Sequence, residues 1–276
     1  MPMPAQMILT FTTIPPRLPL LGPALAAFAA QKRRLDAVEL YLPKQWRRFP
    51  GERPSLPPLP DWVTVVEVDH DYGPATKVLP ALERYRGRDI DILFCDDDML
   101  HDPLWTSRFA AMRAERPEDV LCEYGLDLAD LCKDAALVPQ DRPQPRAQIN
   151  HVSTAELSAS RRAMAKGGPG IPYLRAPGHV DVLFGFRGCL LRPGWLDPRA
   201  TDLPGIVWTV DDVWLSGMAA LAGRHIWAGG NACWMQGVGP AVRVNDLNHH
   251  SEAGFGREAA NRLCVDYLRS QYGIWR

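Results

Sequence analysis

The first hundred residues alternate between short apolar runs and longer amphipathic stretches. The short runs are rich in Ile, Leu, Val and Phe and end at Pro, Gly or charged residues, which predicts strands over residues 7–13, 38–42, 62–68 and 90–95. Helices are predicted between them over residues 18–34 and 76–85. Strands that alternate with helices predict βαβ units, and therefore an α/β fold with a Rossmann-type, mostly parallel central sheet flanked by helices.

The pattern continues beyond residue 100 with one interruption. Helices are predicted over residues 103–116, 211–222 and 256–272, and strand character over residues 180–192 and 225–228. In contrast, residues 138–178 are polar, rich in Pro and Gly and weakly periodic, which predicts a flexible loop that is either a functional lid or a disordered insert. We expect an acceptor-side lid that becomes ordered on binding. No internal repeat is visible, so the expectation is one domain over residues 1–276.

Composition narrows the class of protein. Apolar residues make up 46% of the 276 residues and charged residues 23%, which is typical of a globular chain. The formal net charge of −1 provides no basic field for nucleic acid. Six scattered cysteines without C-x-x-C spacing indicate reduced thiols, and no apolar run is long enough for a membrane span. We therefore expect a cytoplasmic protein, with peripheral contact at the inner face of the membrane left open.

Three consecutive aspartates follow the predicted strand at residues 90–95. Asp96, Asp97 and Asp98 would stand at the carboxyl end of that strand, where open α/β sheets bind their ligands. Adjacent carboxylates repel one another, so a cation is expected to offset them. Hard oxygen ligands suit Mg²⁺ or Mn²⁺, and Asp96 and Asp98 point the same way in an extended segment. The alternative interpretation is a solvated acidic turn.

A second acidic pair, Asp211 and Asp212, begins the predicted helix over residues 211–222. Negative charge is favoured in a first helical turn, which by itself would explain the pair. Its functional interpretation is a carboxylate that deprotonates or orients a hydroxyl group. Lys77 and Arg17 are candidate cations that assist a departing phosphate, with a surface lysine as the alternative for Lys77.

A strand that ends in D-x-D after an N-terminal βαβ arrangement resembles the nucleotide-sugar glycosyltransferases of the GT-A type, such as those of family 2. The resemblance covers residues 8 to about 272 and is strengthened by the downstream Asp211-Asp212 pair. It implies a nucleotide diphosphate-sugar donor, UDP- or GDP-linked, and a glycan, lipid-linked or other hydroxyl acceptor. It also implies a Mn²⁺ or Mg²⁺ cofactor, a donor-binding half over residues 1–100 and an acceptor half over residues 101–276.

The resemblance also implies roles for individual residues. Asp96 would face the ribose or the metal, Asp97 the donor sugar or ribose, and Asp98 the metal. Asp212, or else Asp211, would act on the acceptor as a base in an inverting enzyme or as an orienting group in a retaining one. The remaining positions that it implies are the donor-binding residues Thr12 and Thr13, and a third metal ligand from His249 or His250, with a solvated loop as the alternative for the two histidines. Asp69 joins Arg17 and Lys77 as a candidate donor-binding residue because the loop over residues 69–77 faces the same edge of the sheet. Gly185 could let the backbone approach the donor sugar, or simply fit a bulged strand.

Two other functions stay open at this point. An apolar strand that runs into D-x-D also occurs in Mg²⁺-dependent phosphohydrolases of the haloacid dehalogenase type, although that family carries the motif on its first strand. A nucleotide-sugar-binding module without catalysis is the second alternative. Turnover of a donor would separate these possibilities from glycosyl transfer.

Overall fold

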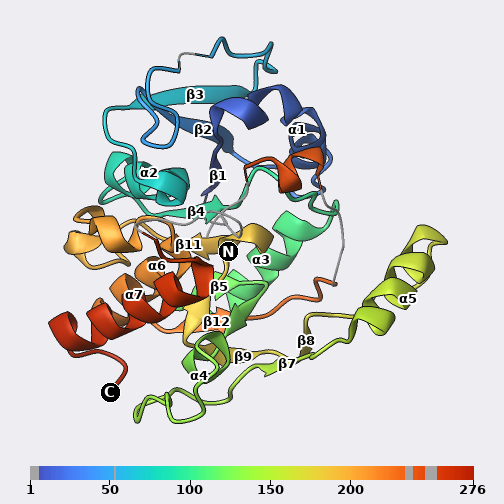
Figure 1. Cartoon of the computed structure of the whole chain (residues 1–276). Helices are drawn as coiled ribbons and strands as arrows, with labels where there is room; N and C mark the ends of the chain where they lie inside the picture. Colours follow the sequence, from blue (N-terminus) through green and yellow to red (C-terminus); the bar gives the residue numbers. More distant parts are fainter. Residues whose placement is uncertain (1–5, 53, 234–238, 246–253) are drawn as a thin grey trace.

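The computed structural model describes residues 6–52, 54–233, 239–245 and 254–276. A sheet of eight strands in the order β3-β2-β1-β4-β11-β5-β12-β9 forms its centre (Figure 1). The strands are β1 (Gln6–Thr12), β2 (Ala37–Pro43), β3 (Val63–Val68), β4 (Ile90–Phe94), β5 (Val120–Cys122), β9 (Gly178–Val180), β11 (Cys189–Leu191) and β12 (Ile226–Ala228).

The predicted fold class is confirmed. The four strands of the first hundred residues pair in parallel, β3 with β2, β2 with β1 and β1 with β4, and β12 is parallel to β5. The pairings β4–β11, β5–β11 and β9–β12 are antiparallel, so the sheet is mixed toward its other edge. Strands from both halves of the chain share this one sheet, which makes the fold a single domain.

Helices cover both faces of the sheet (Figure 1). The core alternates along β1: Met7, Leu9 and Phe11 pack in one apolar cluster, and Ile8 packs in the other. This two-sided burial explains why the strands read as nearly continuous apolar runs. The first cluster includes residues of α1 (Gly22–Ala29) and α3 (Trp105–Glu115), and the second includes residues of α2 (Leu79–Arg84), α6 (Asp211–Leu221) and α7 (Arg257–Tyr272).

Short elements complete the described chain. Two small antiparallel sheets join β6 (Gly125–Leu126) with β10 (Val182–Leu183), and β7 (Gln148–Ile149) with β8 (Leu174–Ala176). The other helices are α4 (Leu128–Leu131), α5 (Thr154–Ala165) and the 3-10 helices η1 (Pro15–Leu20), η2 (Gly73–Lys77), η3 (Gly185–Arg187), η4 (Pro198–Thr201), η5 (Gly205–Val207) and η6 (Pro240–Arg243).

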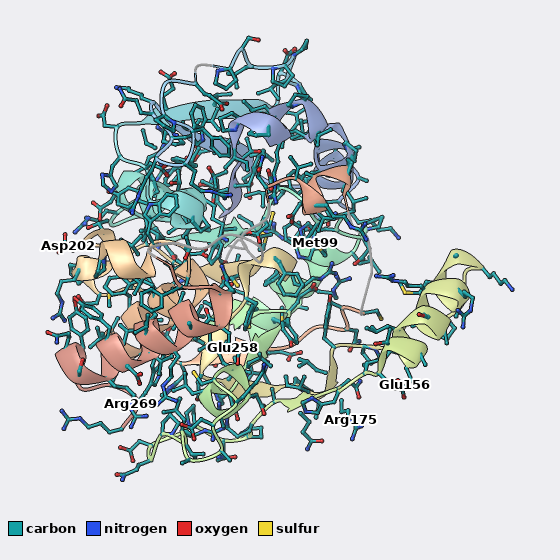
Figure 2. The ribbon with its side chains drawn as sticks, viewed as in Figure 1. Met99, Glu156, Arg175, Asp202, Glu258 and Arg269 are labelled. Atoms are coloured by element: carbon teal, nitrogen blue, oxygen red, sulfur yellow. The ribbon has the colours of Figure 1, made fainter. Side chains whose placement is uncertain are left out.

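The prediction of an irregular loop over residues 138–178 is wrong, because the segment contains helix α5 and the paired short strands β7 and β8. This helix stands apart from the rest of the molecule, with Glu156 on its surface (Figures 1 and 2). A capping box begins it: the Ser153 hydroxyl accepts from the Glu156 amide, and the Glu156 carboxylate accepts from the Ser153 amide. The lid role stays a prediction.

Two predicted helices are shorter than expected. Instead of residues 18–34, the structure has η1 followed by α1, which ends at Ala29, so the basic residues 32–34 lie beyond the helix. Pro23 explains the restart, because it favours the first turn of a new helix. The expected helix over residues 76–85 is likewise divided into η2 and α2, with Pro80 in the first turn of α2.

Two expectations about the environment of the chain, on its cysteines and on membrane spans, can be compared with the structure. All six cysteines are free, and Cys95, Cys122, Cys189 and Cys264 are buried, as expected for reduced thiols. Within the described residues, no helix combines the length and the apolar character that crossing a membrane requires.

Candidate functional site

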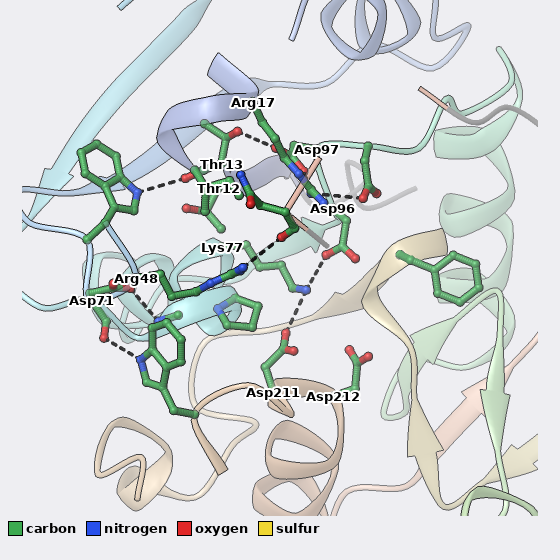
Figure 3. Close-up of a pocket in the computed structure, with 18 of the residues that line it drawn as sticks. Thr12, Thr13, Arg17, Arg48, Asp71, Lys77, Asp96, Asp97, Asp211 and Asp212 are labelled. Atoms are coloured by element: carbon green, nitrogen blue, oxygen red, sulfur yellow. Dashed lines mark hydrogen bonds and ion pairs between the residues drawn. The ribbon is translucent and has the colours of Figure 1, made fainter. Parts of the chain in front are cut away.

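A pocket of about 470 Å³ lies where the parallel strands end (Figure 3). Thr12 and Thr13 at the end of β1, Pro43 at the end of β2 and Asp96 just after β4 line it. The opposite wall comes from later elements, with Asp211 and other residues of α6 and α7. Both halves of the chain therefore contribute to one site at the carboxyl edge of the sheet, as expected for an open α/β fold.

Two cations pair with the three aspartates after β4, Lys77 with Asp96 and Arg17 with both Asp97 and Asp98. Asp96 Oδ1 lies 2.6 Å from Lys77 Nζ. Asp97 accepts hydrogen bonds from the Thr13 hydroxyl at 2.5 Å and from Arg17 Nη1 at 2.8 Å. Arg17 Nη1 also lies 3.1 Å from Asp98 Oδ2. Thr13 and Arg17 follow β1 directly, so pairing of β1 with β4 brings these groups together.

Lys77 joins the two acidic clusters that the sequence separates by more than a hundred residues. Its ammonium lies 2.6 Å from Asp96 Oδ1 and 2.9 Å from Asp211 Oδ2, and its side chain is 3% exposed (Figure 3). Burial alone would lower the pKa of Lys77, but the carboxylates of Asp211, Asp96 and Asp212 raise it well above its ordinary value. Lys77 is therefore a structural cation of the pocket, not a surface lysine.

Asp212 is held differently from its neighbour Asp211. Its Oδ1 accepts from the Gly185 backbone amide at 2.9 Å, and its Oδ2 lies 3.6 Å from Arg257 Nη2. Burial and the adjacent Asp211 carboxylate raise the pKa of Asp212 to about 7, although Lys77 and Arg257 oppose the shift. Asp212 is thus the member of the pair that can gain and lose a proton near neutral pH.

The pKa values of the three aspartates after β4 diverge. Although burial favours the neutral form, Lys77, Arg17 and Arg257 lower the pKa of Asp96. Burial raises the pKa of Asp97 in spite of Arg17 and Thr13. Burial and the carboxylates of Asp96 and Asp97 raise the pKa of Asp98 to about 7. The basic side chains at this end of the pocket therefore do not fully neutralise its carboxylates.

The charge imbalance extends over the whole pocket. Among its described lining residues are six aspartates, namely Asp71, Asp96, Asp97, Asp98, Asp211 and Asp212, and four basic residues, namely Arg17, Arg48, Lys77 and Arg257. A phosphate-bearing ligand would bring further negative charge. That charge would meet a lining in which acidic side chains already outnumber basic ones.

The carboxylates after β4 provide the ligand type that Mg²⁺ and Mn²⁺ prefer. Magnesium sites in proteins are often built from one or two carboxylates completed by substrate phosphates and water, and Asp96 and Asp98 fit that pattern. No group of three or more His, Cys, Asp or Glu side chains in the described part of the chain has the geometry of a complete metal site. His249 and His250, the expected third ligands, lie outside the described residues.

The other predicted donor-binding residues fall in different places. Thr12 lines the pocket, although its hydroxyl donates to the Tyr41 carbonyl at 2.7 Å. Gly185 lies behind the lining and positions Asp212. Asp69 is not brought into the pocket: its side chain is 88% exposed and pairs with Lys44.

Sequence reasoning missed several residues of the site. Asp71, two positions after Asp69, lines the pocket and accepts hydrogen bonds from the amides of Arg47 and Gly73, each at 2.7 Å. The indole of Trp208 donates to the Asp71 carbonyl at 3.1 Å (Figure 3). Arg257 and Asn261 enter from α7, Arg48 from the segment after β2, and Phe184 and Phe186 from the chain around η3. Among these residues, only Phe184 and Phe186 had a feature that the sequence could have revealed, namely their aromatic character.

Neither a protein-family model nor a curated protein sequence matches the chain. Among solved structures, S. aureus TarS 1–349 is 14% identical with a TM-score of 0.46, over 83% of this chain and 59% of that one. The same fragment in complex with UDP-GlcNAc is 14% identical with a TM-score of 0.43, over 83% of this chain and 57% of that one. A longer TarS structure is 15% identical with a TM-score of 0.43, over 83% of this chain and 36% of that one. The chain spans less than two thirds of the length of each of these structures.

Proposed function

We propose that this protein is a metal-dependent glycosyltransferase that moves a sugar from a UDP- or GDP-linked donor to a hydroxyl group of a glycan, lipid-linked or other acceptor. The observation that carries the proposal is the position of Lys77. It contacts Asp96 in the acidic cluster after β4 and Asp211 in the pair on α6, so that a cation-binding corner and a proton-accepting carboxylate lie in one pocket. Transfer from a diphosphate donor to a hydroxyl group can use both, the first for the departing diphosphate and the second for the acceptor proton.

The donor would lie along the ends of β1 and β4. Asp96 and Asp98 would hold Mg²⁺ or Mn²⁺, and the cation would supply charge stabilisation for the departing diphosphate. Thr13 and Arg17 keep Asp97 in place at 2.5 and 2.8 Å, so the turn that carries the two ligands is fixed before the donor binds. Such preorganisation lowers the free energy needed to order the site.

Asp212 would accept the proton of the acceptor hydroxyl in an inverting reaction. The Gly185 amide orients one of its oxygens, and Arg257 lies beside the other. A base is most effective when its pKa lies near the working pH, and the pKa of Asp212 is raised to about 7. Asp211 is a poorer candidate because Lys77 occupies its Oδ2.

The test is turnover of UDP- and GDP-sugars with Mn²⁺, followed by release of the nucleoside diphosphate and by analysis of the glycoside product. We expect Asp212→Asn to reduce turnover about 10²- to 10⁴-fold, the contribution typical of general base catalysis, with donor affinity kept. Asp69→Asn is the matched control and should behave as wild type, since Asp69 lies on the surface.

Other outcomes would point elsewhere. Wild-type turnover in Asp212→Asn together with an inactive Asp211→Asn would move the role to Asp211. Release of phosphate from sugar phosphates without transfer would indicate the phosphohydrolase. Donor binding without any turnover would indicate a binding module. An inverted anomeric configuration in the product is expected, and a retained one would contradict the role of Asp212 as a base.

A further inference from the structure

Asn261 is a polar residue in the pocket wall, and its side chain has no hydrogen-bond partner among the described residues. It lies on α7, is 9% exposed and lines the cavity, yet none of the described residues makes a hydrogen bond to its amide. Because the side chain lines the cavity, a ligand there can reach its amide. Such a ligand could donate to the amide oxygen and accept from the amide nitrogen.

Arg257 lies one helical turn before Asn261, so the two side chains share a face of α7. Its Nη2 is 3.6 Å from Asp212 Oδ2, and its Nη1 donates to the Thr209 carbonyl at 2.6 Å. Asn261 therefore lies one turn along α7 from the arginine that stands beside the carboxylate proposed to receive a proton. A second substrate, the acceptor, would bind at this position, across the pocket from the acidic cluster after β4.

Two phenyl rings border the same place. Phe184 and Phe186 line the pocket on either side of Gly185, whose amide binds Asp212. They pack with Tyr124 at centroid distances of 5.4 and 5.7 Å, which fixes their positions. An apolar wall beside an amide and a carboxylate matches a sugar ring, which has apolar C–H faces and hydroxyl groups at its edge.

The charges favour a neutral ligand. On this side of the pocket, Arg257 is balanced by Asp212, and Lys77 by Asp96 and Asp211. An anionic group would approach Asp211 and Asp212 without an unbalanced cation to receive it. The amide of Asn261, in contrast, can donate to one hydroxyl and accept from another.

We propose that Asn261, Arg257, Phe184 and Phe186 form the acceptor subsite, and that it takes a neutral sugar ring, with the reacting hydroxyl beside Asp212. This inference rests on the proposed glycosyl transfer. It adds to that function the chemical class of the acceptor and the residues that select it.

The test is saturation-transfer NMR with the protein loaded with UDP and Mg²⁺. The probes are the methyl β-D-glycosides of glucose, galactose and mannose, and the methyl glycoside of glucuronic acid as the anionic counterpart of the first. We expect ring-proton signals from at least one neutral glycoside and weaker ones from the glucuronide. Failure of all three neutral glycosides to bind, or preferred binding of the glucuronide, would overturn the proposal.

Binding of the glycosides to variants of the protein tests which residues form the subsite. Asn261→Leu, which keeps the size of the side chain, should weaken binding of the best neutral glycoside about tenfold, since roughly one well-placed hydrogen bond or two are lost. Phe186→Leu should reduce the signals of the ring protons. Gln271→Ala removes an exposed amide from the same helix and should have no effect.

The same samples separate this proposal from the proposed function. UDP affinity should be unchanged in Asn261→Leu, because the residue belongs to the acceptor side. If Asn261→Leu and Phe186→Leu bind the glycoside like wild type while UDP still binds, the subsite assignment is wrong and donor binding stands. If neither UDP nor GDP binds the wild-type protein, the proposed function itself fails.

Discussion

At the scale of single residues, Lys77 holds the site together. It is a buried cation between Asp96 and Asp211, and removing one partner of a buried ion pair leaves the others with unpaired charge. Surface pairs contribute far less, because water already solvates their charges. The surface pair of Lys44 with Asp69, in which the lysine side chain is 55% exposed, therefore provides a comparison.

Lys77→Met should destabilise the fold by about 3–5 kcal/mol, the range found when buried pairs are broken. The measurement is the free energy of unfolding from urea titration at neutral pH. Lys44→Met should cost less than about 1 kcal/mol. Equal costs for the two variants would show that the Lys77 contacts are not a buried network.

Because of Asp212, the rate of turnover should be higher at neutral and alkaline pH than at acidic pH. Only its deprotonated form can accept a proton, and burial beside Asp211 raises its pKa to about 7. Turnover at saturating donor should therefore fall as the pH drops below about 7, whereas an ordinary aspartate would remain deprotonated down to about pH 4. A profile that stays flat to about pH 5 would contradict this role.

Several site residues were predictable because their signals are local. A carboxylate cluster directly after a buried strand must lie at the sheet edge, so Asp96, Asp97 and Asp98 were identified from the sequence. Asp69 was predicted as a donor-binding residue, but Asp71 lines the pocket and Asp69 does not, because loop sequence does not indicate which side chain turns inward. Asn261 was missed because a single amide within an amphipathic helix has no distinguishing pattern.

At the scale of elements, strands were predicted better than the helices between them. The strands β1, β2 and β4 are buried along nearly their whole length and are therefore distinct in sequence, and the edge strand β3 is marked by its β-branched residues. Helix α5 was missed because its apolar face is small, although Ser153 and Glu156 form a capping box that the sequence displays. Proline placement set the real helix boundaries in the first half of the chain.

The turn at η3 places backbone against the charged side chains of the pocket. A Cβ atom at Gly185 would lie 2.8 Å from Lys77 Nζ and 3.3 Å from Asp212 Oδ1. Lys77 cannot move aside without loosening its contacts to Asp96 and Asp211. A glycine is therefore required here for close approach, not for chain flexibility.

Gly185→Ala should reduce turnover at least about tenfold, because both Lys77 and Asp212 must shift. The readout is the rate of donor turnover beside a thermal unfolding curve. Gly205→Ala, where an added Cβ meets nothing within 4 Å, should leave the rate unchanged. Wild-type turnover in Gly185→Ala would show that this contact does not position the two side chains.

At the scale of the whole molecule, the sheet order creates the site. Pairing of β1 with β4 joins Thr13 and Arg17 to the acidic cluster, and α6 and α7 on one face of the sheet bring Asp212 and Asn261 to the same pocket. The sequence predicted that the two acidic clusters share a sheet edge only through the family resemblance. The Lys77 bridge between them depends on tertiary packing, which local patterns do not reveal.

The central claim is that Asp98 helps to hold a divalent cation on which the donor diphosphate depends. Isothermal calorimetry of UDP and of GDP, with Mn²⁺ and with EDTA, tests it most directly in wild type and in Asp98→Ala. We expect one of the two nucleotides to bind wild type only with Mn²⁺, and Asp98→Ala to abolish this binding. Equal affinity with and without Mn²⁺, or wild-type affinity in Asp98→Ala, would contradict it.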